Sequence, residues 1–171
     1  MPHIREMNEA DVEAVSAIRV RGWQSAYAGI VPQPYLDAMT VAADAAQRRA
    51  WFTHPGRQST DLVAVDAGAP VGWISFGPCR EQPPGMRAAG EIYALYVLPG
   101  LTRRGTGRAL LAEAHSRMVT HPFPLSVLWV LRDNGGARRF YERLGYRADG
   151  GTQDDDYDGV VLTELRYQRP L

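Results

Sequence analysis

Apolar positions along the chain follow two periods. Short runs in which apolar residues alternate with polar ones, or follow one another directly, are typical of β-strands. Such runs predict strands at 3–7, 61–66, 70–77, 91–98, 124–131 and 160–167. The residues that join the second and third of these runs include glycine and proline, which indicates a hairpin there.

Apolar residues at steps of three and four predict the helices. In the first of them Val12, Val15 and Ile18 fall on one face. Asn8 can cap this helix, and Asp11 stands at the spacing of a capping box. The same periodicity, with the prolines and glycines that end it, predicts helices over 8–30, 40–53, 103–120 and 134–145 and a short helical turn over 32–39.

The order of these elements predicts a mixed α/β (α+β) fold. A strand is followed by helices, three strands, a helix, a strand, a helix and one or two strands. This order joins an antiparallel N-terminal half to a βαβ crossover. No linker or internal repeat divides the sequence, so we expect one domain over 1–171. The polar residues 149–159 predict a loop before the last strand.

Composition narrows the classes of function. The 171 residues carry 19 basic and 19 acidic side chains, and this balance argues against a nucleic-acid partner. Every basic residue apart from histidine is arginine, which excludes a Walker-type phosphate lysine and a Schiff base. The single cysteine, Cys79, excludes an intrachain disulfide, and the four histidines lack metal-site spacing. With no signal core and no membrane-length apolar run, we expect a cytoplasmic protein with neither a metal site nor a membrane partner.

The predicted helix at 103–120 starts within a stretch rich in glycine and arginine. Its arginines and glycines are Arg103, Arg104, Gly105, Gly107 and Arg108. A helix N-terminus favours anions, and glycines let a ligand approach the backbone closely, so the loop is a candidate phosphate site. A dinucleotide fingerprint fits poorly, because Leu110 occupies its third glycine position and the glycines lie well beyond the strand. A plain turn with solvated arginines stays open at this point.

Two segments together resemble the GNAT superfamily of N-acetyltransferases. The first, 102–107, matches the acetyl-CoA-binding pattern (Q/R)-x-x-G-x-(G/A) at Gly105 and Gly107 and departs from it at Thr102. The second segment has the pattern N-x-x-A-x-x-F-Y-x-x-x-G-[FY], with matches at Asn134, Ala137, Phe140, Tyr141, Gly145 and Tyr146. The strand order is also the family's, so the resemblance covers most of the chain.

The resemblance implies a fold, an activity and a set of contacts. The fold is a mixed, mostly antiparallel central sheet with one splayed parallel strand pair and helices on both faces. The activity is transfer of an acetyl group from acetyl-CoA, the cosubstrate, to a primary amine by direct attack on the thioester. Tyr141 matches the tyrosine that hydrogen-bonds the CoA sulfur and acts as general acid. The implied cofactor contacts are Tyr96, Val97, Leu98, Arg103, Arg104, Gly105, Thr106, Gly107, Arg108, Asn134 and Tyr141.

Glu91 is the candidate general base. It stands fourteen residues before Gly105, a spacing that resembles the histone-acetylating branch of the family, where a glutamate takes the proton. Alternation along the strand predicts that Glu91, Tyr93, Leu95 and Val97 share one face. Proton transfer through ordered water stays open, and so does a solvated glutamate with no role in catalysis.

The acceptor can be a small-molecule or a protein amine. Candidate residues of its pocket are Trp23, Tyr27 and Tyr93. Four acids before the last strand can form a rim that attracts a cationic amine: Asp154, Asp155, Asp156 and Asp158. Cys79 is interpreted as a bystander. A non-catalytic acyl-CoA-binding sensor is the alternative function, and a homodimer is one option for assembly.

Overall fold

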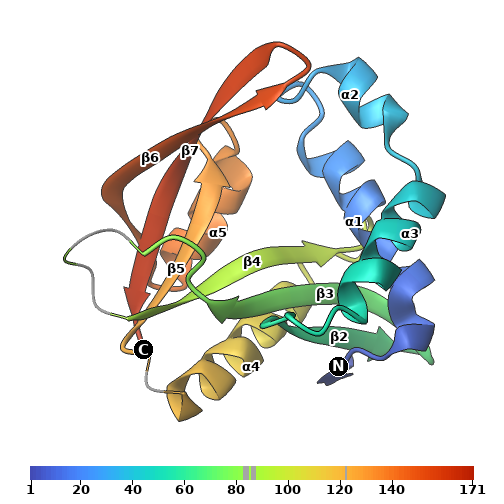
Figure 1. The fold of residues 1–171 in the computed structure, drawn as a ribbon, viewed down its shortest axis with the longest axis horizontal. Coiled ribbons are helices and arrows are strands. Elements are labelled where there is room, and N and C mark those ends of the chain that lie inside the picture. Colours follow the sequence, from blue (N-terminus) through green and yellow to red (C-terminus); the bar gives the residue numbers. More distant parts are fainter. Residues whose placement is uncertain (83–84, 86–87, 122) are drawn as a thin grey trace.

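Seven strands form one sheet in the computed structural model, which describes residues 1–82, 85, 88–121 and 123–171. The strand order is β1-β2-β3-β4-β5-β7-β6, and β4 and β5 are the parallel pair in this otherwise antiparallel described sheet (Figure 1). The strands are β1 (His3–Glu6), β2 (Thr60–Asp66), β3 (Ala69–Pro78), β4 (Ala89–Val97), β5 (Leu125–Leu131), β6 (Arg147–Tyr157) and β7 (Val160–Pro170). The predicted mixed, mostly antiparallel sheet is confirmed.

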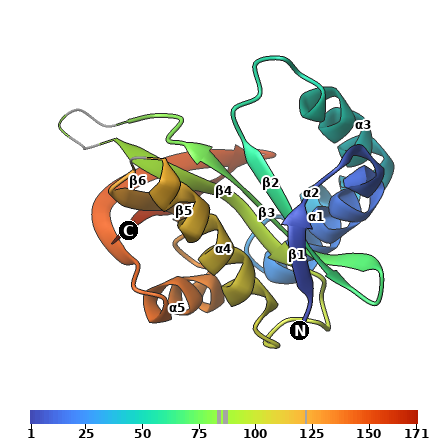
Figure 2. The same ribbon diagram turned by 90° about the horizontal axis from the view of Figure 1, so that it is seen from below.

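Helices cover both faces of the sheet, as predicted, with α4 on one side and α1 and α3 on the other (Figure 2). They are η1 (Glu9–Asp11), α1 (Val12–Ala26), α2 (Gln33–Ala38), α3 (Val41–Phe52), α4 (Thr106–Thr120) and α5 (Gly135–Arg143). The predicted capping box is present, with Asp11 accepting from the Asn8 N–H at 2.9 Å. None of the helices in the described part of the chain has the length and apolarity to cross a membrane.

Two apolar clusters hold these layers together. On the α4 side, Ile74 and Ile92 of the sheet pack against Leu110 of the helix. On the α1 side, Trp73 packs with Val15 and other buried residues. Each such side chain contributes roughly 1.5–3 kcal/mol when it is buried. The central strands are therefore packed on both faces, and this packing fixes the position of the residues at the carboxyl ends of the strands.

The parallel pair comes apart after a short stretch of pairing. β4 and β5 pair only from Ala89 with Leu125 to Ile92 with Leu128. Beyond that point β4 continues with β3, whereas β5 turns away with β7 and β6, and the two groups of strands run at a steep angle to each other in Figure 1. The predicted splay is confirmed, and it leaves the facing edges of the two strands unpaired.

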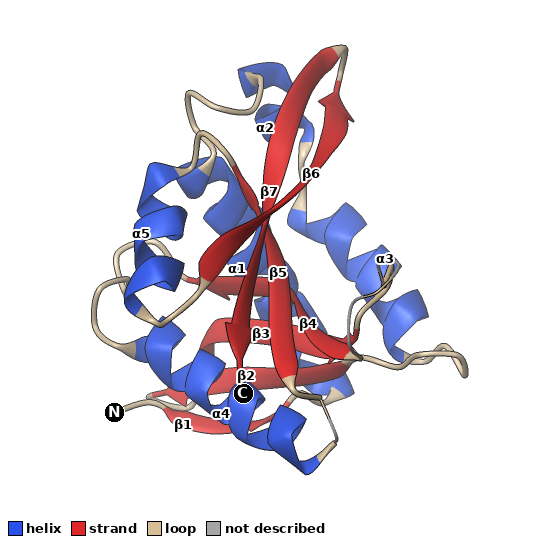
Figure 3. Cartoon of the chain, turned by 90° about the vertical axis from the view of Figure 1, so that its left-hand side faces the viewer, coloured by secondary structure: helices blue, strands red, loops and turns tan. Residues whose placement is uncertain are grey.

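The expectation of a polar loop at 149–159 is wrong, because these residues form most of β6. They pair with β7, for example Asp154 with Thr163, and the hairpin extends toward α2 (Figure 3). Asp158 and Gly159 make the turn with φ of 54° and 86°, the conformation that Asp-Gly favours in a two-residue hairpin. Most of β6 is exposed, so it has no apolar alternation that would reveal a strand.

Candidate active site

A cleft of about 990 Å³ opens where β4 and β5 part. Its walls come from both strands, the C-terminal part of α1, the loop and first turn of α4, α5, and one residue of β7. Most of the predicted site residues line it: Tyr27, Tyr93, Tyr96, Val97, Arg103, Gly105, Thr106, Gly107, Arg108, Asn134 and Tyr141. The structure leaves the others outside its lining: Trp23, Glu91, Leu98 and Arg104.

The N-terminus of α4 forms one end of the cleft. Gly105 is its N-cap with a φ of 86°, a left-handed conformation that glycine adopts at little cost. No side chain caps this helix, and Ala109 donates the first helical bond, so the amides of 106–108 have no helical acceptor. Arg103 and Arg108 stand beside them, exposed and without an ion pair among the described residues. This end is suited to bind an anion.

The backbone of β4 presents unpaired groups to the cleft. Leu98 donates its N–H to the Val71 carbonyl of β3 at 2.9 Å. Backbone groups alternate along an antiparallel ladder, so Tyr96 faces β3 as well, whereas Leu95 and Val97 direct theirs toward the gap left by β5. Among the predicted backbone contacts, Val97 therefore remains available to a ligand, whereas the backbone groups of Tyr96 and Leu98 are already bonded to β3. The backbone groups of Leu95, which was not among the predicted contacts, are available as well.

A β-bulge at Tyr93 changes which side chains share a face of β4. Ile92 pairs with Phe76 and Ala94 with Ser75, so Tyr93 is an extra residue in the strand. As a result Ile92 and Leu95 both pack on the α4 side, although strict alternation would separate them. The expectation that Glu91, Tyr93, Leu95 and Val97 share one face is therefore wrong, because the bulge reverses the alternation between Glu91 and Leu95.

Glu91 lies outside the cleft and is held by Arg80. Its side chain is 2% exposed. One carboxylate oxygen accepts from Nη2 and Nε of Arg80, at 2.6 and 3.1 Å, and the other accepts from the Arg80 backbone N–H at 2.9 Å. Both oxygens are thus engaged in charge-assisted bonds. A general base must reach the proton that it takes, and this carboxylate is directed to Arg80 instead.

Three phenol groups meet in the middle of the cleft. The hydroxyls of Tyr27 and Tyr96 are hydrogen-bonded at 3.0 Å. Burial raises the pKa of Tyr141, and the neighbouring Tyr96 and Tyr146 raise it further. Burial, chiefly, also raises the pKa of Tyr27. These phenols are protonated at neutral pH, and no hydrogen bond among the described residues uses the hydroxyl of Tyr141, which can therefore donate to a ligand.

Asn134 lines the cleft, whereas Trp23 lies outside the cleft lining. Asn134 also caps α5, since its Oδ1 accepts from the Ala137 N–H at 3.1 Å. Trp23 packs instead in an aromatic cluster, with ring centroids 4.8 Å from Tyr27 and 6.2 Å from Tyr157. Its buried indole N–H makes no hydrogen bond of regular geometry in the described part of the chain, although the Tyr96 hydroxyl lies near it.

The sequence interpretation missed Glu164 of β7 and two arginines of α5. Glu164 pairs in register with Leu131 at the end of β5, and it is the acidic residue among those that line the cleft. Arg139 and Arg143 line it from α5. A glutamate within the apolar run at 160–167 was the available signal for Glu164, since a strand facing only the core would not carry one.

The acidic rim and the other candidate groups lie away from the cleft lining. Asp154 accepts from the Thr163 hydroxyl, and Asp156 accepts from the Gly159 N–H at the turn, so these acids serve the β6–β7 hairpin. The Cys79 thiol donates to the Glu81 carbonyl. Among the residues that the structure describes, no group of three or more His, Cys, Asp or Glu side chains is placed to hold a metal ion.

Known proteins are similar to this chain along most of its length. The sequence profile of the Acetyltransferase (GNAT) family matches residues 22–146. An uncharacterized N-acetyltransferase of Bacillus subtilis is 29% identical over 166 residues, which cover 96% of this chain and 91% of that protein. A probable N-acetyltransferase of Mycobacterium tuberculosis is 30% identical over 155 residues, which cover 87% of this chain and 82% of that protein.

A solved structure has the same fold. The PaiA N-acetyltransferase of Thermoplasma acidophilum, crystallised in complex with coenzyme A, matches with a TM-score of 0.78 and 19% sequence identity. The match covers 100% of this chain and 99% of that chain, so the two chains share their overall fold.

Proposed function

The chain belongs to the acetyltransferase (GNAT) family, and on that premise we propose how its own residues transfer an acetyl group to an amine. It is an acetyl-CoA-dependent N-acetyltransferase, as the two sequence motifs predicted. The proposal concerns which groups hold the donor, which assist the reaction, and where the amine enters.

The residues at the donor end fit acetyl-CoA. The unpaired amides of 106–108, together with Arg103 and Arg108, hold the diphosphate. The free backbone groups of Leu95 and Val97 pair with the pantetheine amides as an added strand would. The amide nitrogen of Asn134 supplies one more contact. Arg139 and Arg143 add positive charge along the same wall.

The reaction needs stabilisation of two developing charges. Bound acetyl-CoA supplies the acetyl group as an activated thioester. An unpaired N–H of β4 polarises its carbonyl as the amine attacks. Tyr141 donates a hydrogen bond to the departing sulfur. Because burial raises the pKa of Tyr141 above its ordinary value, whereas a thiol titrates near about 8.5, we expect Tyr141 to stabilise the thiolate rather than to surrender its own proton.

One observation carries this proposal. A single cleft runs from the uncapped N-terminus of α4, past the Tyr141 hydroxyl, to Tyr27 and Glu164 on β7. Donor and acceptor can therefore approach the same point from opposite ends. The alternative, a non-catalytic sensor, has no need for the acceptor end.

Release of CoA thiol in the presence of a panel of primary amines tests the proposal. We expect thiol release that depends on the amine, with the N-acetylated amine as product. Tight binding of acetyl-CoA, measured by calorimetry, with no turnover of any amine in the panel would support the sensor instead.

The remaining expectations stay predictions. A cytoplasmic location, a homodimer, the absence of a metal and the choice between a small-molecule and a protein amine each await their own measurement. Size-exclusion chromatography with light scattering will establish the oligomeric state.

A further inference from the structure

Charge is divided between the two ends of the cleft. The arginines that line it come from the α4 loop and from α5, where the donor binds: Arg103, Arg108, Arg139 and Arg143. At the other end Glu164 supplies the carboxylate. The field in the cleft therefore favours an anion at one end and a cation at the other.

Glu164 is free to receive a cation. One carboxylate oxygen accepts from the amide nitrogen of Gln153 at 2.6 Å, which orients the group, and no ion pair of the described residues includes it. The side chain is partly buried at the cleft wall. Glu91 is the opposite case, because Arg80 occupies both of its oxygens.

Two arginines around Glu164 already have partners. Arg166 follows two residues later on the same face of β7, but its Nε lies 2.7 Å from Asp149 and its guanidinium lies 5.7 Å from the Trp129 ring. Arg80 is bound to Glu91. These pairs leave the charge of Glu164 available to a ligand.

Aromatic rings stand around the same end. Tyr27, Tyr93 and Trp129 line the cleft with Glu164, and two of these rings already attract a cation. The guanidinium of Arg80 lies 4.9 Å from the Tyr93 ring, and that of Arg166 lies 5.7 Å from the Trp129 ring. Ring faces attract an organic cation and cover its apolar body at the same time. A carboxylate among aromatic rings is therefore suited to an alkylammonium group.

We propose that Glu164, and not Glu91, binds the ammonium group of the acceptor and takes its proton. The proposal rests on the proposed function, since it concerns the amine that attacks the thioester. It assigns the acceptor to the primary amines that are cationic at neutral pH and carry an apolar or aromatic body.

The step balances as follows. A proton moves from the ammonium nitrogen to an oxygen of Glu164, directly or through one water, and leaves the nitrogen lone pair free. The nitrogen–carbon bond forms, the carbon–sulfur bond breaks, and the electron pair stays on sulfur, where Tyr141 donates its hydrogen bond. The second amine proton is then lost to solvent, the thiolate takes up a proton from solvent, and Glu164 releases the proton that it took. The products are the amide and CoA thiol, and one proton is released overall.

The test compares Glu164→Gln with the wild type on two amines of similar shape, benzylamine and aniline. Benzylamine is a cation at neutral pH, whereas aniline is already uncharged. We expect kcat/KM for benzylamine to fall about 100-fold at neutral pH and the loss to shrink as pH rises, because the free amine then needs no base. We expect aniline acetylation to change less than about threefold, and binding of benzylamine to the protein–CoA complex to weaken.

Matched controls separate the possible outcomes. Asp154→Asn removes a nearby carboxylate that does not line the cleft and should leave both amines unaffected. Glu164→Asp should restore part of the benzylamine rate. An equal loss for both amines, or a full benzylamine rate in Glu164→Gln, would overturn the role of Glu164. If the wild type binds acetyl-CoA but acetylates neither these amines nor the wider panel, the proposed function itself fails.

Discussion

The two ends of the cleft are built by different means. At the donor end, the site consists mainly of backbone: the uncapped amides of α4 and the free edge of β4. At the acceptor end it consists of side chains on separate elements, with Tyr27 following α1 and Glu164 on β7. A backbone site needs glycines at fixed places, and these are visible in a sequence. A side-chain site depends on which strands meet, and that is decided by the fold.

The comparison also indicates which properties of each end a substitution can change. Backbone amides suit a ligand that stays constant, because their geometry does not depend on residue type. The acceptor end is formed with an exposed hairpin, β6–β7, on which single substitutions can change the charge and shape of the wall. We therefore expect substitutions at the donor end to affect acetyl-CoA binding and substitutions at the acceptor end to affect the amine.

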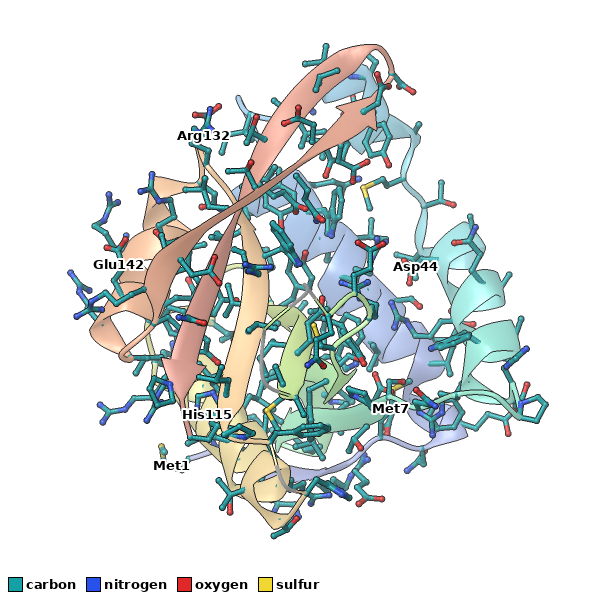
Figure 4. The ribbon with its side chains drawn as sticks, turned by 60° about the vertical axis from the view of Figure 1, so that its left-hand side comes forward. Met1, Met7, Asp44, His115, Arg132 and Glu142 are labelled. Carbon is teal, nitrogen blue, oxygen red and sulfur yellow. The ribbon has the colours of Figure 1, made fainter. Side chains whose placement is uncertain are left out.

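The largest expected effect concerns a buried polar network that joins α4 to β5 and β7 and has no residue in the cleft lining. His115 lies on α4 beside β5 and β7 (Figure 4). Arg169 of β7 donates to its Nδ1 at 3.1 Å, so Nε2 carries the hydrogen and donates to the Tyr146 hydroxyl at 2.7 Å. The Tyr146 hydroxyl is also hydrogen-bonded to the hydroxyl of Ser126 on β5, at 2.7 Å. This network requires a neutral histidine.

Acid should therefore lower the free energy of unfolding of the protein. Burial, and then Arg169, lower the pKa of His115 from 6.5 to about 4. The unfolded chain binds the proton first, so stability is full above about pH 6.5 and falls by about 3 kcal/mol as pH drops toward 4. Urea unfolding at several pH values will measure this. His115→Gln should lose that part of the pH dependence, and an unchanged slope in the variant would contradict the assignment.

The next effect lies at the point where the two ends meet. Tyr141→Phe removes the hydroxyl that faces the cleft, and we expect kcat to fall about 100-fold, as for the loss of one positioned donor. The affinity for acetyl-CoA should stay within about threefold, because the ring and its packing remain. Stopped-flow turnover and calorimetry give the two numbers. An unchanged kcat would remove Tyr141 from the mechanism.

A matched pair of glycines tests whether the ends are independent. Gly105 and Gly159 both have a φ of 86°, and an added Cβ would meet nothing within 4 Å at either place. Alanine should therefore cost about 1 kcal/mol of stability at each. Only Gly105→Ala should weaken acetyl-CoA binding, whereas Gly159→Ala should raise KM for the amine alone. Equal effects on both ligands would show that the ends are coupled.

The smallest effect distinguishes two neighbouring arginines. Arg108 lines the cleft and Arg104 does not, although both are exposed. We expect Arg108→Ala to weaken acetyl-CoA binding about fivefold, less so at high salt, and Arg104→Ala to change it less than about twofold. Calorimetry at two salt concentrations will test this. Equal losses would place Arg104 in the site as well.

Much of the donor end could be predicted because its signals are local. Gly105 and Gly107 stand at the start of one helix, and Asn134 and Tyr141 stand at fixed spacing at the start and within the next helix. The exceptions have physical reasons. Nothing in the sequence marks the bulge at Tyr93, which reversed the face of β4 and misled the interpretation of Glu91.

The acceptor end could not be predicted in the same way. β6 lies in an exposed two-stranded ribbon, so its sequence is polar and lacks the apolar alternation that predicts a strand. The Asp-Gly turn that follows it was a usable hairpin signal. Because the hairpin was not predicted, the sequence did not show which residues lie next to Glu164. The partner of Glu91, Arg80, lies in a preceding loop, and only the folded chain brings the two together.

A crystal structure of the complex with CoA and a bound primary amine tests the central claim most directly. We predict the diphosphate on the amides of 106–108, the sulfur at the Tyr141 hydroxyl and the amine nitrogen within hydrogen-bonding distance of Glu164. An amine seated elsewhere, or a sulfur turned away from Tyr141, would contradict the account of a cleft that brings donor and acceptor together from opposite ends.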